Sequence, residues 1–557
     1  MSLKILIKGL KMSSILTNIM IKFWVEMYYF QEGGHMAFVS ILGTAKNEEI
    51  QGKKQPDFFV DLNLDQVINR VQKSSPDYPV KEYFYEFPPK EDVGYRQEIY
   101  RDIRKQSLYD RFMQFSADMR RSADKELSPT FSGEPLQGAC WQLESVYFYC
   151  KAIVELRQEL ETGIAKQEIT AVGLKELQSF LEELCKEPDF AEMQEEAYDI
   201  WEMLTGTKFT LEINGNKLRI SQMAQEGTYE DLLTECFKEY GVVEKGSMHS
   251  PFTTDLFLTR LERRLLQTFF GKYPDLEVEI TSFAEKYQQY KKPQILQLEK
   301  EVQFYLAFYA FQKEWKAQGA VFCTPTFDET RPMEGLEVYD LALACVNYPA
   351  EKEVVSNDFT YASKEQFFIV NGPNQGGKTT FARSLGQLIY FAKMGLDVNA
   401  KKANLRYFDR LVTHFSVEES MESGQGKLME ELRRLAPIMN KGCEKAFVII
   451  NELFTTAAHY DGCIMGARVL DFFMKRSCHG VYVTHLRALG EGTDGVVHMA
   501  AMLDGSDEHR RTFKIMRSEA EQRGHAGDIV GKYQLTYTEL RERLKDYATQ
   551  KGGVSHV

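Results

Sequence analysis

Apolar side chains recur at steps of three and four residues between about Gly94 and Gly206. This spacing puts them on one face of a helix, so the region is predicted to form amphipathic helices that bury that face. Pro188 ends one of the runs, because proline is not tolerated inside a regular helix. The two clearest runs consist of Leu143, Val146, Tyr147, Cys150 and Val154, and of Leu174, Leu177, Leu181 and Leu184. A shorter run from Asp61 to Val71 predicts one further helix.

The pattern then changes twice. Between Phe209 and Ile220 apolar residues alternate on both sides of Asn214-Gly215-Asn216, which predicts a β-hairpin. Helical spacing resumes near Thr253 and is expected to continue, with an interruption at Pro293, to about Gln318.

From Val321 onwards short strands and helices alternate, which is typical of an α/β domain. Three apolar strands are predicted at Phe367–Val370, Ala446–Ile450 and Val481–Thr484. A second hairpin is expected around Asp504-Gly505, between 496–503 and 512–516, and a terminal helix at about 537–547. The predicted fold class is therefore mixed, with a mainly α-helical region followed by an α/β domain.

Composition narrows the possible partners. The chain has 557 residues and a formal net charge of −13, so no global positive field attracts nucleic acid, and any such contact needs a local patch. Nine cysteines occur without a C-x-x-C pair, which argues against a zinc site or a disulfide scaffold and suits the reducing cytoplasm. We therefore expect a cytoplasmic protein.

Residues 1–35 differ from the rest because lysines are scattered among apolar residues. The lysines keep every apolar run well below the roughly 20 residues of a membrane span, and a signal peptide would need a clean apolar core. A basic amphipathic anchor is one interpretation. We favour another, because the codons for Glu32-Gly33-Gly34-His35 before Met36 can form a ribosome-binding site. Residues 1–35 are thus expected to be a leader or a disordered extension.

The strongest chemical signal follows the first of the three strands. Residues 372–379 have the pattern G-x-x-x-x-G-K-T, placed between a strand and a helix, which is the context that a phosphate-binding loop requires. Glycines let backbone N–H groups turn towards phosphate oxygens, and the helix N-terminus adds a partial positive charge. Lys378 can reach the β- and γ-phosphates, and the Thr379 hydroxyl can bind Mg²⁺. The predicted ATP-binding residues are Gly372, Pro373, Asn374, Gln375, Gly376, Gly377, Lys378, Thr379 and Thr380.

Hydrolysis also needs a group that activates water. The strand Ala446–Ile450 ends in Asn451-Glu452, the usual form of a Walker B element. Glu452 is therefore the candidate base, and a capping role on a loop is the alternative.

Several motifs together resemble the ATPase domain of the MutS family. They are GPNQGGKTT at 372–380, ESGQGKLMEEL at 422–432, VIINEL at 448–453, YDG at 460–462 and VTH at 483–485. The resemblance is strong from about Val321 to the C-terminus and weak from about Tyr95, where the family has core and lever helices. It implies an ABC-type, P-loop ATPase that uses ATP and Mg²⁺ and forms a head-to-tail homodimer.

The resemblance also implies individual roles. Glu452 would polarise the attacking water, and His485 would sense the γ-phosphate, so these two are the expected catalytic residues. Thr379 and Asn451 would hold the metal. Glu431 matches an acidic position of the signature helix, although a solvated pair with Glu430 is equally compatible with the sequence.

Three departures from the family pattern suggest slow or gated hydrolysis. Walker B usually has Asp-Glu, and here Asn451 supplies no charge, so metal affinity should fall. Gly426 stands where the signature segment usually offers a serine to the partner's γ-phosphate, and Lys427 follows it. After Glu452 the family's Gly-Arg-Gly-Thr-Ser-like loop is replaced by residues 454–458, Phe-Thr-Thr-Ala-Ala.

The expected domains follow from this resemblance. They are the extension at 1–35, an N-terminal segment with the helical core and lever at 36–205, a small β or clamp-like insertion at 206–250, returning lever helices at 251–320, and the MutS-type ATPase domain at 321–557. The clamp-like insertion has five Lys and Arg against seven Asp and Glu, a balance of −2, where DNA binding favours positive charge. Phe84-Tyr85-Glu86 has the short Phe-x-Glu pattern of the family's mismatch reader but lacks its context, so we expect a chance match and no mismatch-reading domain.

The sequence therefore predicts a dimeric MutS-like ATPase that acts as a DNA clamp in repair or recombination, with branched or non-B DNA as the expected partner and no membrane. The alternative is a nucleotide-gated switch with weak hydrolysis that acts on a protein, ribosome or RNA. A small-molecule kinase is disfavoured, because no lid or acceptor site is visible.

Overall fold

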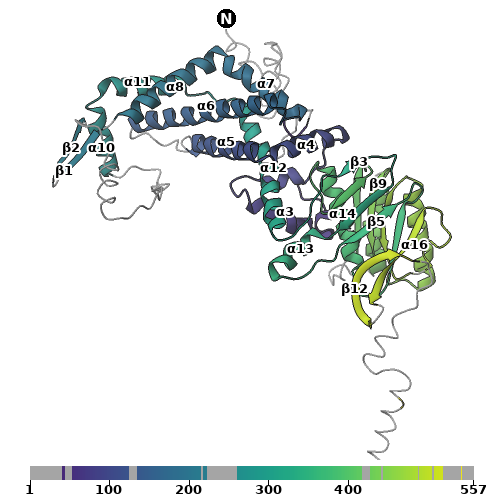
Figure 1. Cartoon of the computed structure of the whole chain (residues 1–557). Coiled ribbons are helices and arrows are strands. Elements are labelled where there is room, and N and C mark those ends of the chain that lie inside the picture. The colour runs from purple at the N-terminus through teal and green to yellow at the C-terminus, as the bar shows by residue number, and fades with distance from the viewer. Residues whose placement is uncertain are drawn as a thin grey trace, which may run out of the picture.

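The computed structural model describes residues 40–43, 53–124, 135–207, 209–214, 217–222, 260–416, 427–440, 443–486, 488–504, 507–518 and 541. Figure 1 shows two unlike regions, a group of long helices and a sheet flanked by helices, with the helices extending away from the sheet. The fold is mixed, as predicted. The expectations for residues 1–35, and for the terminal helix apart from residue 541, lie outside the described residues.

The first region consists of helices and one hairpin. Its elements are α2 (Phe58–Asp61), α3 (Leu64–Lys73), the 3-10 helix η3 (Val80–Phe84), α4 (Lys90–Ile103), α5 (Gln106–Asp124), α6 (Pro135–Ala165), α7 (Val172–Lys186), α8 (Pro188–Gly206), β1 (Phe209–Asn214), β2 (Lys217–Gln222), α10 (Arg260–Phe270), α11 (Pro274–Lys286) and α12 (Pro293–Ala317). No helix among the described residues is both long enough and apolar enough to cross a bilayer.

The helical spacing of the sequence is confirmed in α6 and α7. Leu143, Val146 and Cys150 are buried in α6, and the four leucines of the second run are all buried in α7. Pro188 occupies the first turn of α8, where its missing N–H costs no hydrogen bond. The predicted β1–β2 hairpin is confirmed, with Leu211 opposite Ile220. Figure 1 shows this hairpin at the end of the helical region far from the sheet.

Two helix predictions need correction. The run from Asp61 to Val71 is split, because Asn63 has a left-handed φ of 55° between α2 and α3. The helical stretch predicted from about Thr253 to Gln318 is interrupted before Pro293, as expected, and also at a second place. There α10 ends at Phe270 and α11 begins at Pro274. In each case a local backbone constraint overrides the apolar spacing. It is the left-handed Asn63 in the first case and Pro274 in the second.

The second region contains two sheets. Its elements are β3 (Thr326–Phe327), β4 (Met333–Val338), α13 (Leu341–Asn347), the 3-10 helix η4 (Tyr348–Ala350), β5 (Asn357–Tyr361), β6 (Phe367–Asn371), α14 (Lys378–Lys393), β7 (Lys402–Leu405), β8 (Arg410–Phe415), α15 (Lys427–Asn440), β9 (Ala446–Asn451), α16 (His459–Met474), β10 (His479–Val483), β11 (Val496–Asp504) and β12 (Asp507–Arg517). In the described residues the larger sheet has the order β12-β11-β6-β10-β9-β8, and the smaller one β3-β7-β4-β5.

The larger sheet is parallel from β11 to β8, and only β12 runs antiparallel. Its central strands are covered on both faces, which explains their continuous apolar sequence. Phe368 and Val370 belong to the core shared with α14 and the helical region, whereas Phe367 and Ile369 belong to the core with α15 and α16. The three predicted strands and the second hairpin are confirmed here.

The two regions share one continuous core at their junction. Phe308 of α12 packs against Phe391 of α14, with ring centroids 5.3 Å apart. Beside them, the carboxylate of Asp397 accepts hydrogen bonds from Arg104 after α4, from Gln312 of α12 at 2.9 Å and from Thr324 at 2.7 Å. The Asp397 side chain is almost completely buried, so these contacts fix the sheet region against α4 and α12.

Candidate functional site at the carboxyl edge of the sheet

Three neighbouring parallel strands end at the same place. Val483, the last residue of β10, lies opposite Val370 of β6 on one side and Asn451 of β9 on the other. The residues that follow these strands therefore converge at one edge, which is where open α/β sheets bind ligands.

The predicted phosphate loop connects β6 to α14. Gly372, Gln375 and Gly377 have positive φ values of 131°, 62° and 90°, which turn the chain sharply before α14 begins at Lys378. A side chain at Gly372 would lie 2.9 Å from the Cβ of Ala501 in β11. Gly372 is thus required both by its φ and by the close approach of the neighbouring strand.

Lys378 points back into this loop. Its Nζ donates hydrogen bonds to the carbonyl oxygens of Gly372 and Pro373, each at 2.9 Å. Burial lowers the pKa of Lys378, while the carboxylate of Glu452 opposes that shift. The loop therefore surrounds a lysine ammonium, which suits it to an anionic ligand.

Thr379 and Asn451 are brought together as predicted for a metal pair. The Thr379 hydroxyl donates to Oδ1 of Asn451 at 2.9 Å, and Asn451 is buried. A hydroxyl and an amide oxygen are both ligand types that Mg²⁺ accepts, directly or through water. The residues present therefore fit a magnesium ion, although the pair carries no negative charge.

Glu452 and His485 form a second pair. His485 Nε2 lies 3.0 Å from Oε1 of Glu452, and both side chains are partly exposed. Glu452 has a positive φ of 56°, and its backbone N–H donates to the carbonyl of Val483 at 2.9 Å. A non-glycine residue in this region is strained, and such strain clusters at functional sites. The turn directs a carboxylate to the same edge as Lys378.

The other predicted loop residues lie around this centre. Asn374 and Gln375 are exposed at the tip of the loop, Pro373 and Gly376 are buried, and Thr380 is half-buried in the first turn of α14.

Comparison with known proteins agrees with this geometry. A family model described as MutS domain V matches residues 368–530, which include the loop, Asn451, Glu452 and His485. These residues are thus similar to MutS domain V, which supports assignment of the chain to the MutS family.

Similar MutS-family proteins match only part of the chain. The chain is 29% identical over 190 residues to "Endonuclease MutS2" of Thermus thermophilus, covering 34% of this chain and 25% of that protein. It is 31% identical over 137 residues to "DNA mismatch repair protein MutS" of Thermotoga sp. (strain RQ2). This match covers 25% of this chain and 17% of that protein. The protein of that name from Chlorobium chlorochromatii is 24% identical over 250 residues, and the match covers 41% of this chain and 28% of that protein. The chain thus matches little more than a quarter of any of these three.

Glu431 stabilises the turn that follows Glu452. It is 4% exposed, and its Oε2 accepts a hydrogen bond from the backbone N–H of Phe454 at 3.1 Å. Phe454 has a positive φ of 62°, so a buried carboxylate holds a second strained residue. The alternative of a solvated Glu430–Glu431 pair is wrong. Gly426 lies outside the described residues, and the side chain of Lys427 is not described.

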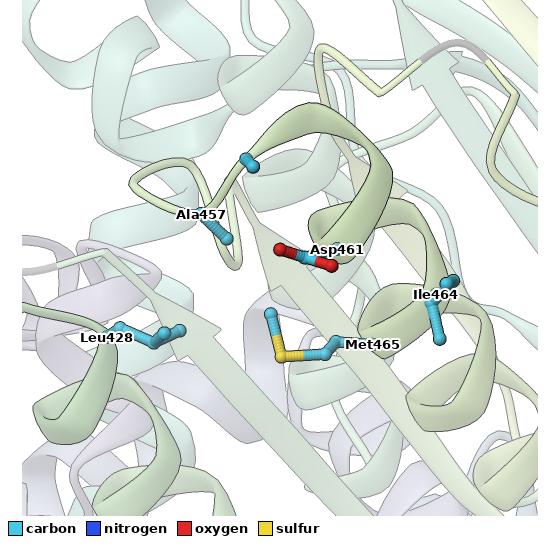
Figure 2. A pocket seen from close by; sticks show the side chains of 6 residues that line it. Leu428, Ala457, Asp461, Ile464 and Met465 are labelled. Atoms are coloured by element: carbon cyan, nitrogen blue, oxygen red, sulfur yellow. The ribbon is translucent and has the colours of Figure 1, made fainter.

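A pocket of 360 Å³ lies beside this turn. It is lined by Leu428 of α15, by Ala457 and Ala458, and by Asp461, Ile464 and Met465 of α16. Figure 2 shows Leu428 on one side of the pocket and Met465 on the other, with Asp461 beside the loop that carries Ala457. The replaced 454–458 segment therefore forms part of an accessible hollow between two helices.

Sequence reasoning gave the β11–β12 hairpin no role in the site. Ala501 of β11 nevertheless contacts the loop closely, since a side chain at Gly376 would also lie 2.9 Å from its Cβ. The two small residues Ala500-Ala501 within β11, which runs parallel to β6, were the signal that the sequence offered.

The phenylalanine of the Phe-x-Glu segment is buried, although Glu86 is exposed. Phe84 is 1% exposed and packs against Phe304 with ring centroids 4.8 Å apart. This agrees with a chance match. The clamp-like insertion after Gln222 lies outside the described residues until α10.

Proposed function

We propose that this chain binds ATP with Mg²⁺ and hydrolyses it slowly, as a MutS-like protein that acts as a dimeric clamp on DNA in repair or recombination. One observation carries the proposal, namely the convergence of Lys378, the Thr379–Asn451 pair and the Glu452–His485 pair at one edge of the sheet. The names of the relatives, an endonuclease and mismatch repair proteins, support DNA as the partner.

Each of these groups has a defined task in the proposal. Lys378 would bind phosphate oxygens in place of the Gly372 and Pro373 carbonyls. Glu452 would orient and polarise the attacking water, while His485 would hold the Glu452 carboxylate and contact the terminal phosphate. Thr379 and Asn451 would hold Mg²⁺, which when bound neutralises charge on the phosphates.

The homodimer has its own support. Large apolar side chains are exposed on the two helices that line the pocket, namely Met429 and Leu432 of α15 and Tyr460 and Ile464 of α16. Clustered exposed apolar residues are typical of an interaction surface. A second copy that covers this face would place its own loop near α15, in keeping with the head-to-tail arrangement that the family resemblance implies.

The alternative remains a nucleotide-gated switch with weak hydrolysis that acts on a protein, ribosome or RNA. The balance of −2 in residues 206–250 favours it, because DNA phosphates are bound by Lys and Arg.

A single set of assays separates the two proposals. ATP binding and hydrolysis are measured for the wild type and for Lys378→Ala, without DNA and with matched, mismatched and four-way-junction DNA, alongside ribosome pelleting. We expect at least about tenfold weaker ATP binding by Lys378→Ala, because an ionic contact is lost. For the clamp we expect junction DNA to bind more tightly than linear duplex, with no preference for the mismatch.

Unchanged ATP affinity in a folded Lys378→Ala protein would refute the nucleotide site. Tenfold tighter binding to mismatched than to matched duplex would refute the absence of mismatch reading. ATP binding without binding to any of the DNAs, together with nucleotide-dependent pelleting with ribosomes, would favour the switch.

A further inference from the structure

The β11–β12 hairpin is distorted where it passes the loop. Ala501 lies opposite Ile515 and Leu503 lies opposite Arg511, so Thr512, Phe513 and Lys514 together face Met502 alone. Phe513 has a positive φ of 57°. Bulges of this kind redirect side chains and often occur beside active sites.

The bulge is held in place from both sides. The side-chain amide of Asn357 in β5 donates to the carbonyl of Phe513 at 3.2 Å, and its Oδ1 accepts from the N–H of Ile515 at 2.7 Å. Thr512 donates to the carbonyl of Met502 at 2.7 Å. A side chain at Gly377 would lie 3.5 Å from the backbone of Phe513, so the bulge rests against the start of α14.

Arg511 immediately precedes this bulge and pairs with Leu503. Its Nη1 is buried and has no hydrogen-bond partner in the part of the chain that the structure describes. Its positive charge lies close enough to Lys378 to lower the pKa of that lysine further, after the larger effect of burial. A buried guanidinium nitrogen without a hydrogen-bond partner is costly unless an anion satisfies it.

We propose that Arg511 is a second cationic contact, from the same chain, for the phosphates of the nucleotide bound at residues 372–380. The inference rests on the proposed ATP site and extends it with a residue from the hairpin, which the sequence motifs leave without a role.

The strand order indicates which end of the polyphosphate Arg511 meets. β11 and β12 lie on one side of β6, whereas β10 and β9, which carry His485 and Glu452 at their ends, lie on the other side. The hydrolysed phosphate belongs near Glu452, so Arg511 belongs towards the nucleoside end. It therefore binds ATP and ADP alike and does not act in the hydrolytic step.

The test compares Arg511→Gln, Arg511→Lys and the wild type in equilibrium binding of ATP and ADP, with Mg²⁺ and with EDTA. Lys514→Gln is the matched control, because it removes the same charge from an exposed position on the same bulge, where Lys514 contacts the carbonyl of Ser356. We expect Arg511→Gln to weaken both nucleotides about tenfold, since one charge-assisted hydrogen bond is lost. Arg511→Lys should recover part of the loss, and kcat should change less than about twofold.

Thermal unfolding separates ligand binding from a structural role. If Arg511 binds phosphate, Arg511→Gln removes a buried guanidinium nitrogen that has no hydrogen-bond partner in the described part of the unliganded protein. The Tm without ligand should then stay the same or rise. The increase in Tm that ADP causes should become smaller. A lower Tm without ligand together with unchanged affinities would overturn the proposal, as would an equal loss of affinity in Lys514→Gln. Wild-type binding that depends on Lys378 but not on Arg511 would overturn this inference alone. A wild type that binds neither ATP nor ADP would overturn the proposed function as well.

Discussion

The carboxyl edge of the large sheet and the helical region from α4 to α12 are stabilised and specified in different ways. At the sheet edge, polar side chains such as Glu452 and His485 are partly exposed and follow short motifs. In the helical region, aromatic side chains such as Phe308 are buried against residues far away in the sequence. Substitutions at the edge should therefore change chemistry without unfolding the protein, and substitutions in the helical core should do the reverse.

The largest effect is expected from Phe308→Ala. The ring contacts Phe84, Tyr100, Phe311 and Phe391, so its removal should lower the free energy of unfolding by about 3–5 kcal/mol. Chemical denaturation measures this loss, with Val278→Ala on the exposed face of α11 as a control that should change stability by less than about 0.5 kcal/mol. A loss below about 1 kcal/mol for Phe308→Ala would break the comparison.

Glu452→Gln tests the other half of the comparison. We expect kcat to fall at least about 100-fold because the base is lost, while Tm and ATP affinity stay close to those of the wild type. Single-turnover hydrolysis and equilibrium binding measure the two effects. Normal turnover would place the base elsewhere, and a large loss of Tm would show that the Glu452 side chain also supports the fold.

The motifs at the sheet edge made much of the site predictable from sequence, and the helical region offered less. A glycine pattern and a strand-terminal Glu are local signals, so Lys378, Thr379, Asn451 and Glu452 could be predicted to meet at parallel strand ends. Apolar spacing predicted which faces of α6 and α7 are buried, but not which helices they pack against.

The remaining features depend on contacts that no local pattern specifies. The role of Glu431 depends on the N–H of Phe454, 23 positions along the chain. Asn63 and Pro274 broke helices whose apolar spacing continued past them. Arg511 depends on a bulge set by Asn357 of another strand, and strand spacing alone gives no sign of it.

A third prediction compares two histidines of one segment. His479 begins β10, and His485 follows the end of that strand by two positions. His479 is buried, and its Nε2 lies 2.6 Å from Nη1 of Arg406. Since guanidinium only donates, Nε2 must be unprotonated. Burial and the Arg406 charge lower the pKa of His479 to about 4. His479 therefore belongs to the structural part of the comparison although it lies on the strand that leads to His485.

The sign of its pH dependence follows from that direction. Between about pH 6.5 and pH 4 the unfolded chain protonates His479 before the folded chain does, so stability falls as pH falls through this window, by at most roughly 3 kcal/mol. Stability below and above the window should not depend further on this group. Denaturation at several pH values should show a shallower slope for His479→Gln, which keeps an acceptor but does not titrate. An identical slope would contradict the prediction.

The smallest effect is expected from Asn451→Asp. A negative charge beside Thr379 should lower the Mg²⁺ concentration for half-maximal hydrolysis by about three- to tenfold, because carboxylates bind Mg²⁺ better than amides. It should also slightly reduce stability without Mg²⁺, since the residue is buried. Magnesium titration of the ATPase rate measures the first effect, and an unchanged half-saturation point would place the metal ligand elsewhere.

The hydrogen bonds at Asp397 determine where the helical region can bend. Moving α4 and α12 away from the sheet would strip the buried carboxylate of Asp397 of its donors Arg104 and Gln312 and leave only Thr324 among these three, at a cost of about 3–5 kcal/mol. These helices and α14, which starts directly after the loop, therefore behave as one rigid body. Any bend of the helical region is therefore expected farther from the sheet than the contacts at Asp397.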